Sequence, residues 1–123
     1  MNRSVLIVDD NAIFRRAVRH VFMSQEDFAV CGEAENGRDA KAQALHPDLI
    51  VMDLAMPVMG GIDAARVLSR LMPKVPLVAL SGYSDLFSEK DARSAGISAL
   101  VSKSEHISVL LGKARALLYH AAA

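Results

Sequence analysis

Five polar side chains of this 123-residue chain stand at the ends of short apolar runs, and their types suit the binding of a cation and a phosphate. Magnesium prefers carboxylate oxygens and water, whereas an ammonium group and a hydroxyl bind phosphate oxygens. Two carboxylates about 4 Å apart repel by roughly 4 kcal/mol at an effective dielectric near 20, so a carboxylate cluster favours a cation. The residues are Asp9, Asp10, Asp53, Ser81 and Lys103.

The run Leu49–Met52 is the clearest of the apolar runs and is expected to be a strand buried on both faces. Pro57 and the pair Gly60–Gly61 end that strand and open a turn toward a helix. Asp53 therefore stands at the carboxyl end of a strand. In open α/β sheets ligands bind at that edge, which makes this carboxylate a candidate site residue.

Strand and helix patterns alternate along the whole chain. Apolar runs predict strands over 5–8, 28–31, 49–52, 77–80 and 99–101, with the second one weaker and near an edge. Apolar residues at helical spacing predict helices over 14–22, 40–45, 62–72, 85–95 and 107–118. Ser84 or Asp85 is expected to cap the fourth helix, and Gly96 is expected to end it.

This alternation predicts an α/β fold in which helical crossovers join parallel strands. The expected fold class is a flavodoxin-like three-layer sandwich with a five-stranded parallel sheet and five helices. Alternation alone does not give the strand order. The order 2-1-3-4-5 is one of two common solutions, and it places strands one and three side by side at the switch point. On that order Asp9, Asp10 and Asp53 converge.

Composition indicates one globular domain and excludes several function classes. The chain is 52% hydrophobic, and its fourteen basic residues balance fourteen acidic ones, so we expect no direct contact with nucleic acid or an anionic membrane. The single Cys31 forms no internal disulfide, which fits a reducing compartment. Val5–Val8 is too short for a secretory or spanning segment. We therefore expect a soluble, cytoplasmic protein.

Each candidate residue also has a purely structural interpretation. Asp9 or Asp10 can be the N-cap of the first helix. Lys103 can be a solvated surface lysine, and Ser81 with Gly82 can form a plain turn. The joint placement favours the functional interpretation, because four of the five expected strands end in a polar group that the chemistry needs.

The chain resembles a response-regulator receiver domain of bacterial two-component signalling across essentially its whole length. The resemblance implies that Asp53 is the phosphoacceptor, that Ser81 is the switch hydroxyl, and that Lys103 contacts the phosphoryl group. The domain would then be a signalling switch that catalyses its own phosphorylation and dephosphorylation, and not an enzyme in the wider sense. The matching motifs are Val5–Asp10, Asp48–Asp53 with Met56–Pro57 and Gly60–Gly61, Leu80–Gly82, and Val101–Lys103.

The resemblance also implies a metal site and a set of partners. Asp9, Asp10 and Asp53 would hold Mg²⁺ or Mn²⁺, together with the backbone carbonyl of Ala55. The phosphodonor would be a sensor histidine kinase, and phosphorylation would drive a homodimer or release an output domain. The domain is expected over residues 1–120, with 121–123 as a tail or the start of a linker.

The chain looks most like receivers that precede a DNA-binding output domain of the LuxR/FixJ helix-turn-helix type. That similarity lies in Phe14-Arg-Arg, Gly32–Gly37 and Lys103-Ser104. A stand-alone receiver and a receiver-like interaction domain without phosphorylation are the alternatives. Two other classes lack their signatures: a haloacid-dehalogenase-type hydrolase needs Asp-x-Asp after the first strand, and a flavin module needs a Ser/Thr/Gly-rich loop there.

Two positions depart from the pattern of the family. Ser104 stands where many receivers have a proline after the lysine, so a differently shaped loop is expected before the last helix. Leu100 stands where many have Tyr or Phe, so the usual aromatic switch is absent. We expect Ser81 and the loop from Gly82 to carry most of the conformational change.

Overall fold

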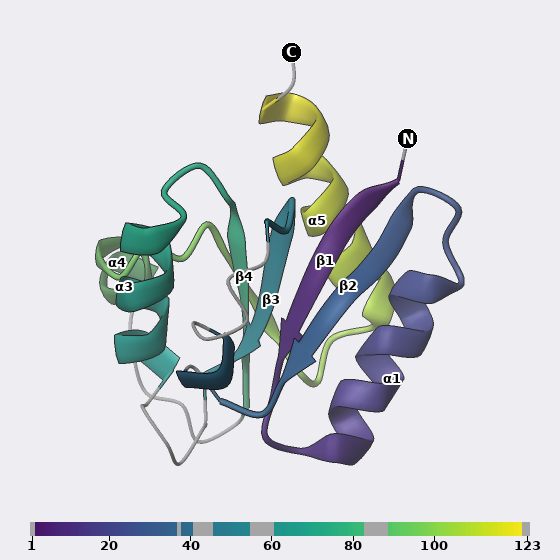
Figure 1. Ribbon diagram of the computed structural model, residues 1–123, viewed down its shortest axis with the longest axis horizontal. Coiled ribbons are helices and arrows are strands. Elements are labelled where there is room, and N and C mark those ends of the chain that lie inside the picture. Colours follow the sequence, from purple (N-terminus) through teal and green to yellow (C-terminus); the bar gives the residue numbers. More distant parts are fainter. Residues whose placement is uncertain (1, 37, 41–45, 55–60, 83–88, 122–123) are drawn as a thin grey trace.

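The computed structural model describes residues 2–36, 38–40, 46–54, 61–82 and 89–121 (Figure 1). Residues 38–40 are helical where the second helix was expected, and 41–45 lie outside the described residues. In chain order the elements are β1 (Arg3–Val8), α1 (Ala12–Met23), β2 (Phe28–Ala34), β3 (Leu49–Asp53), α3 (Gly61–Leu71), β4 (Leu77–Ser81), α4 (Glu89–Ser94), β5 (Ala99–Ser102) and α5 (Ile107–Ala121).

The five strands form one parallel sheet in the order β2-β1-β3-β4-β5, which confirms the predicted flavodoxin-like sandwich. Helices α1 and α5 lie on one face of this sheet, and α3 and α4 lie on the other (Figure 1). Their buried side chains form one hydrophobic cluster on each face. None of the helices among the described residues has the length and apolar character needed to span a bilayer.

Strand β3 lies at the centre of the sheet, and all five of its residues are buried. The continuous apolar run predicted this burial, because helices cover both faces of a parallel sheet. Its last residue, Asp53, is only 2% exposed, so the strand carries a carboxylate into the protein interior at its carboxyl end.

Strand β2 is the edge strand, as its weaker pattern indicated, but it is longer than the predicted 28–31. Its pairing with β1 shifts register between Val5 and Leu6, so that Val30 and Gly32 have partners on β1 and Cys31 between them does not. Gly32 does not end the strand, because this irregularity lets the pairing continue from Leu6 with Gly32 to Val8 with Ala34.

Gly96 ends α4 as predicted, with a positive φ of 89°. The N–H of Ile97 donates to the carbonyl of Ala92, and the N–H of Gly96 donates to that of Arg93, which is the hydrogen-bond pattern of a Schellman motif. A Cβ at Gly96 would also lie 2.4 Å from Ser69 Oγ on α3, so both the turn and the helix contact require glycine here. The expected cap at Ser84 or Asp85 lies outside the described residues.

Candidate functional site

The carboxyl edge of the sheet gathers the predicted site residues. Val8 of β1 pairs with Met52 of β3, so Asp9 and Asp53 follow neighbouring paired residues. One carboxylate oxygen each of Asp9, Asp10 and Asp53 lies within 4.8 Å of the others. The strand order therefore brings Asp53 together with two adjacent acids, Asp9 and Asp10, that are more than forty positions away from it in the sequence.

Asp9 is the most electrostatically strained member of this cluster. Its side chain is buried, with 1% of the residue exposed, and its Oδ2 has no hydrogen-bond partner. Burial raises the pKa of Asp9 to about 6, and the nearby Asp53 charge adds to that rise, while the Asn11 N–H bonded to Oδ1 and the Lys103 ammonium oppose it. A buried, unsatisfied carboxylate beside two other acids is the donor set of a hard divalent cation, so the residues present fit such an ion.

Lys103 supplies positive charge to the same place. Its Nζ lies 3.2 Å from Asp53 Oδ1 and 3.8 Å from Asp9 Oδ2. The first distance allows a hydrogen bond, whereas the second is too long for one, so the ammonium attracts Asp9 without satisfying its oxygen. Lys103 is therefore not a solvated surface lysine, and it bridges the two buried carboxylates.

The N-cap of α1 is Asn11, and neither Asp9 nor Asp10 fills that role. Asn11 Oδ1 accepts hydrogen bonds from the N–H groups of Ile13, at 3.0 Å, and Phe14, at 3.1 Å. Because Asn11 satisfies the free N–H groups of the first turn, both aspartates remain available to the acidic cluster. From the sequence, only Asp9 and Asp10 were considered for this position, although Asn has nearly the same capping preference as Asp.

Ser81 ends β4 at the same edge, next to Lys103. Its carbonyl accepts a hydrogen bond from the Lys103 N–H at 2.8 Å, and Ser81 pairs with Ser102. The position of Ser81 agrees with its predicted place in the site, while its role stays a prediction. Ala55, the predicted source of a metal-binding carbonyl, lies outside the described residues, as does the motif at Met56–Pro57 and Gly60.

The loop behind Lys103 uses Ser104 in a way that proline does not permit. The N–H of Ser104 donates to Ser102 Oγ at 3.2 Å, and the two hydroxyls lie 2.7 Å apart. Proline has no N–H, so this loop is closed by hydrogen bonds that receivers with a proline here cannot make. These hydrogen bonds are consistent with the expected difference at Ser104, while the different loop shape stays a prediction.

Two neighbours of the site were not identified from the sequence. Arg15 Nη1 donates to the Asp9 carbonyl at 2.6 Å, and its Nε donates to Glu33 Oε1 at 3.2 Å, so α1 and β2 together hold the Asp9 backbone. The Phe14 ring lies 4.5 Å from Lys103 Nζ, measured to the ring centroid. Both residues belong to the Phe14-Arg-Arg stretch of the subfamily similarity, but helical spacing alone gives no signal of these contacts.

Comparison with known proteins identifies the family. The family model of the response regulator receiver domain matches residues 5–115. The response regulator domain of Thermotoga maritima CheB superposes with a TM-score of 0.85 at 27% identity, covering 97% of this chain and 98% of that one. A two-component response regulator of the LuxR family from an Aurantimonas species gives a TM-score of 0.88 at 27% identity, with 98% and 87% covered.

Among curated proteins, the chain is similar to protein-glutamate methylesterase/protein-glutamine glutaminase 3 of Paramagnetospirillum magneticum. The two are 40% identical over 102 residues, which is 81% of this chain and 28% of that protein. The chain spans between 22% and 29% of the length of the first curated relatives that it matches. The similarity therefore concerns a minor part of those proteins.

Proposed function

The chain belongs to the response regulator receiver domain family, and from that premise we propose that Asp53 is the phosphoacceptor of a magnesium-dependent signalling switch. The observation that carries the proposal is the position of Lys103 Nζ, 3.2 Å from Asp53 Oδ1 and 3.8 Å from an Asp9 oxygen that has no hydrogen bond. The Lys103 ammonium beside this carboxylate can stabilise the negative charge of an added phosphoryl group.

In the proposed reaction a carboxylate oxygen of Asp53 attacks the phosphorus of the donor. An O–P bond to Asp53 forms as the P–N bond of a phosphohistidine, or the P–O bond of acetyl phosphate, breaks in line with it, and the leaving group takes the electron pair. Lys103 moves its ammonium toward the phosphoryl oxygens, and Ser81 donates its hydroxyl hydrogen to one of them. The product is an aspartyl phosphate.

Asp9, Asp10 and Asp53 would hold magnesium, or manganese in its place, with the Ala55 carbonyl as the further ligand that the resemblance implies. When bound, the ion would supply positive charge beside the equatorial phosphoryl oxygens. The chain's own contribution is the arrangement of the acids: Arg15 fixes the Asp9 backbone, and the N–H of Asn11 donates to Asp9 Oδ1, so that Oδ2 is the oxygen left for a cation.

The signal is proposed to leave the site through Ser81 and the fourth helix. Leu100 on β5 lines a hollow of about 270 Å³ together with residues of α4 and α5, including Arg93 and Lys113. A leucine has no ring to swing into the space behind Ser81, so we expect its movement to be small. Either this face or that of α1 and α5 would then form a phosphorylation-dependent homodimer or release an output domain.

The phosphodonor would be a sensor histidine kinase, as for receiver domains generally. For the output, the support for the predicted DNA-binding domain and its role in transcription is the LuxR-family name of a similar solved structure. The curated relatives carry the name methylesterase, so they give no support to transcription regulation. We keep the DNA-binding output as the narrower proposal and the methylesterase type as its competitor.

The test is intact-mass measurement after incubation with acetyl phosphate and magnesium. The wild-type protein should gain one phosphoryl group, and Asp53→Asn should gain none. Asp63→Asn is the matched control, because Asp63 is an exposed carboxylate on α3 whose ion pair with Arg66 is 3.6 Å long. Equal phosphorylation of Asp53→Asn and wild type would exclude Asp53 as the acceptor. No phosphorylation of any variant would favour the interaction domain without phosphorylation.

A further inference from the structure

The ring of Phe14 lies against the ammonium group of Lys103. The distance from Lys103 Nζ to the ring centroid is 4.5 Å, within the range of a cation–π interaction. The ring is half-buried and packs against the core on the α1 and α5 face of the sheet. Phe14 and Lys103 both line a hollow of about 230 Å³, which reaches Leu80 on β4 and Val101 on β5.

The backbone of Phe14 is held in place independently of Lys103. Its N–H donates to the Asn11 side chain, and the next residue, Arg15, binds the Asp9 carbonyl. The first turn of α1 is therefore tied to the same loop that carries the acidic cluster. A ring attached to this turn keeps a fixed position relative to Asp9 and Asp53.

The Phe14 ring can hold the Lys103 ammonium in place without adding negative charge to the site, as a further carboxylate would. An ammonium with one carboxylate at 3.2 Å and another at 3.8 Å is attracted to both, but its four-carbon stem is free to leave the site, and holding it costs side-chain entropy. Glu105 lies in the following loop, where its carboxylate accepts from the Ser102 N–H, so a competing negative charge is near. The uncharged ring attracts the ammonium without adding to the crowded negative charge.

We propose that Phe14 is a positioning residue, whose ring face holds Lys103 over Asp53 in the orientation required for phosphoryl transfer. The proposal deepens the function proposed above and rests on it. Phe14 itself does not contact the reacting atoms. Its contribution is to keep the ammonium between the two buried carboxylates before the donor arrives.

The experiment compares phosphorylation rates with acetyl phosphate and magnesium, corrected for the folded fraction. Phe14→Leu keeps an apolar side chain without a ring, and its rate should fall by about 3- to 10-fold. Phe14→Tyr keeps the ring face and should retain most of the rate. Phenylalanines carrying one, two and three ring fluorines, incorporated at this position alone, should lower the rate stepwise, since fluorine weakens the negative face of the ring while changing its size little.

A second measurement monitors the position of the Lys103 side chain directly by NMR. In the wild type the ring current should move the side-chain proton resonances of Lys103 upfield, and this shift should be lost in Phe14→Leu and kept in Phe14→Tyr. Phe28→Leu is the matched control: it removes a ring that lies under Arg115, at 5.6 Å, and should lower stability without moving the Lys103 resonances.

The outcomes separate this proposal from the function on which it rests. If the wild type is phosphorylated but the fluorinated series has a flat rate and Phe14→Leu leaves the Lys103 resonances in place, Phe14 only fills the core and the proposal is wrong. If no variant is phosphorylated, the proposed function fails. The Lys103 resonances then still decide whether the ring holds the ammonium.

Discussion

Asp9 and Asp27 are the same residue type at opposite edges of one sheet, and their surroundings act in opposite directions. Asp9 follows β1 at the carboxyl edge, where burial raises its pKa to about 6. Asp27 precedes β2 at the amino edge, where hydrogen bonding from Arg115 first, and from Tyr119, lowers its pKa to about 2. One carboxylate is poorly satisfied in the fold, and the other is fully satisfied.

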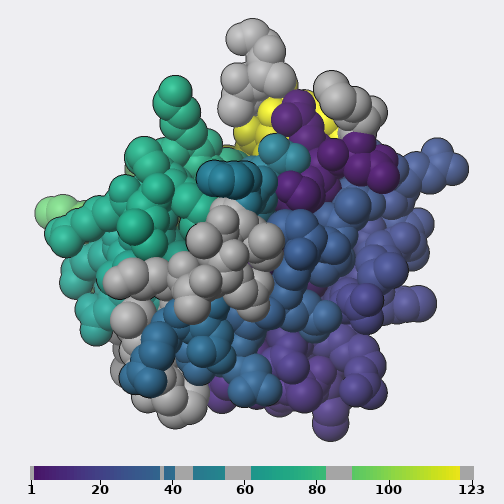
Figure 2. All heavy atoms as spheres, in the orientation of Figure 1, coloured from purple at the N-terminus to yellow at the C-terminus, as the bar shows by residue number. Residues whose placement is uncertain are grey.

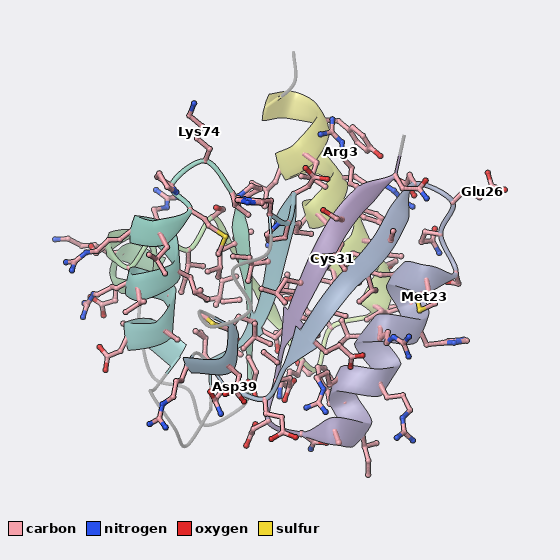
Figure 3. The ribbon with its side chains drawn as sticks, in the orientation of Figure 1. Arg3, Met23, Glu26, Cys31, Asp39 and Lys74 are labelled. Carbon is pink, nitrogen blue, oxygen red and sulfur yellow. The ribbon has the colours of Figure 1, made fainter. Side chains whose placement is uncertain are left out.

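The amino edge joins the two ends of the chain. Arg115 binds Asp27 in a bidentate manner, at 2.9 Å and 3.0 Å, and also donates to Gln25 at 2.8 Å. The Tyr119 hydroxyl donates to the same carboxylate at 2.8 Å, and Arg3 lies over the Tyr119 ring at 5.8 Å. Figure 3, where Arg3 is labelled, shows the start of β1 beside the last turns of α5, and Figure 2 shows the purple N-terminal atoms next to the yellow atoms of α5.

Charged side chains therefore have different effects at the two edges of the sheet. At the amino edge Arg115 and Tyr119 both donate to the Asp27 carboxylate within hydrogen-bond distance, and a bidentate arginine pair is among the stronger charged contacts. At the carboxyl edge Asp9 keeps a buried oxygen with no hydrogen bond, which costs stability until a cation arrives. The first edge stabilises the fold, and the second is stabilised by what binds there.

The largest expected effect comes from Asp9→Asn. Magnesium affinity should fall about 100-fold, because a ligand charge is lost. Without metal, the variant should be more stable than wild type by about 1 to 2 kcal/mol, because the crowded buried charge is gone. Magnesium titration by NMR and denaturant unfolding measure the two effects.

Asp10→Asn is the control: this carboxylate is exposed, so its loss should weaken metal binding without stabilising the fold. If Asp9→Asn were less stable than the wild type without metal, the proposed difference between Asp9 and Asp27 would be wrong.

Asp27→Asn should change stability in the opposite direction and destabilise the fold. The loss of the charge shared by Arg115 and Tyr119 should lower the free energy of unfolding by about 1 to 2 kcal/mol, a value limited by the partial exposure of the pair. A double-mutant cycle with Arg115→Met isolates the pair. A coupling energy near zero would mean that solvent screening has removed its contribution.

The two carboxylates predict a stability maximum in the metal-free protein. Because the Asp9 pKa is raised, its stabilising protonation is present at low pH and is lost as pH rises through about 6, so stability should rise by about 1 kcal/mol from pH 7 to pH 5. Because the Asp27 pKa is depressed, its contribution is lost as pH falls from about 4 toward about 2. Unfolding followed across pH tests both. Asp9→Asn should lack the increase in stability from pH 7 to pH 5. If the variant still shows that increase, another group is responsible for it.

Tyr119→Phe should have the smallest effect. It removes one solvent-exposed hydrogen bond to Asp27 and keeps the ring beside Arg3, so the loss of stability should be smaller than that of Asp27→Asn. Thermal unfolding should show a small decrease in Tm, and the Asp27 pKa measured by NMR should rise slightly. A loss as large as that of Asp27→Asn would show that the hydroxyl, and not Arg115, is the main partner.

The apolar runs determined the strands, and the strands determined which side chains could meet. Leu49–Asp53 was identifiable because a strand buried on both faces must be apolar throughout, and carboxyl ends of parallel strands share one edge. That rule places Asp9, Asp53 and Lys103 at one edge, and the strand order found in the structure brings their side chains together. The roles of Ser81 and of the Ala55 carbonyl stay predictions.

Only the tertiary structure decided which of several equivalent local contacts forms. Asn11 and not an aspartate caps α1, Phe14 faces Lys103, and Arg115 binds Asp27 across 88 positions of the chain. Local spacing predicts which residues share a helix face, but not which distant group that face meets. The competing hydrogen bonds differ little in energy, so the packing of α1 and α5 on the sheet selects among them.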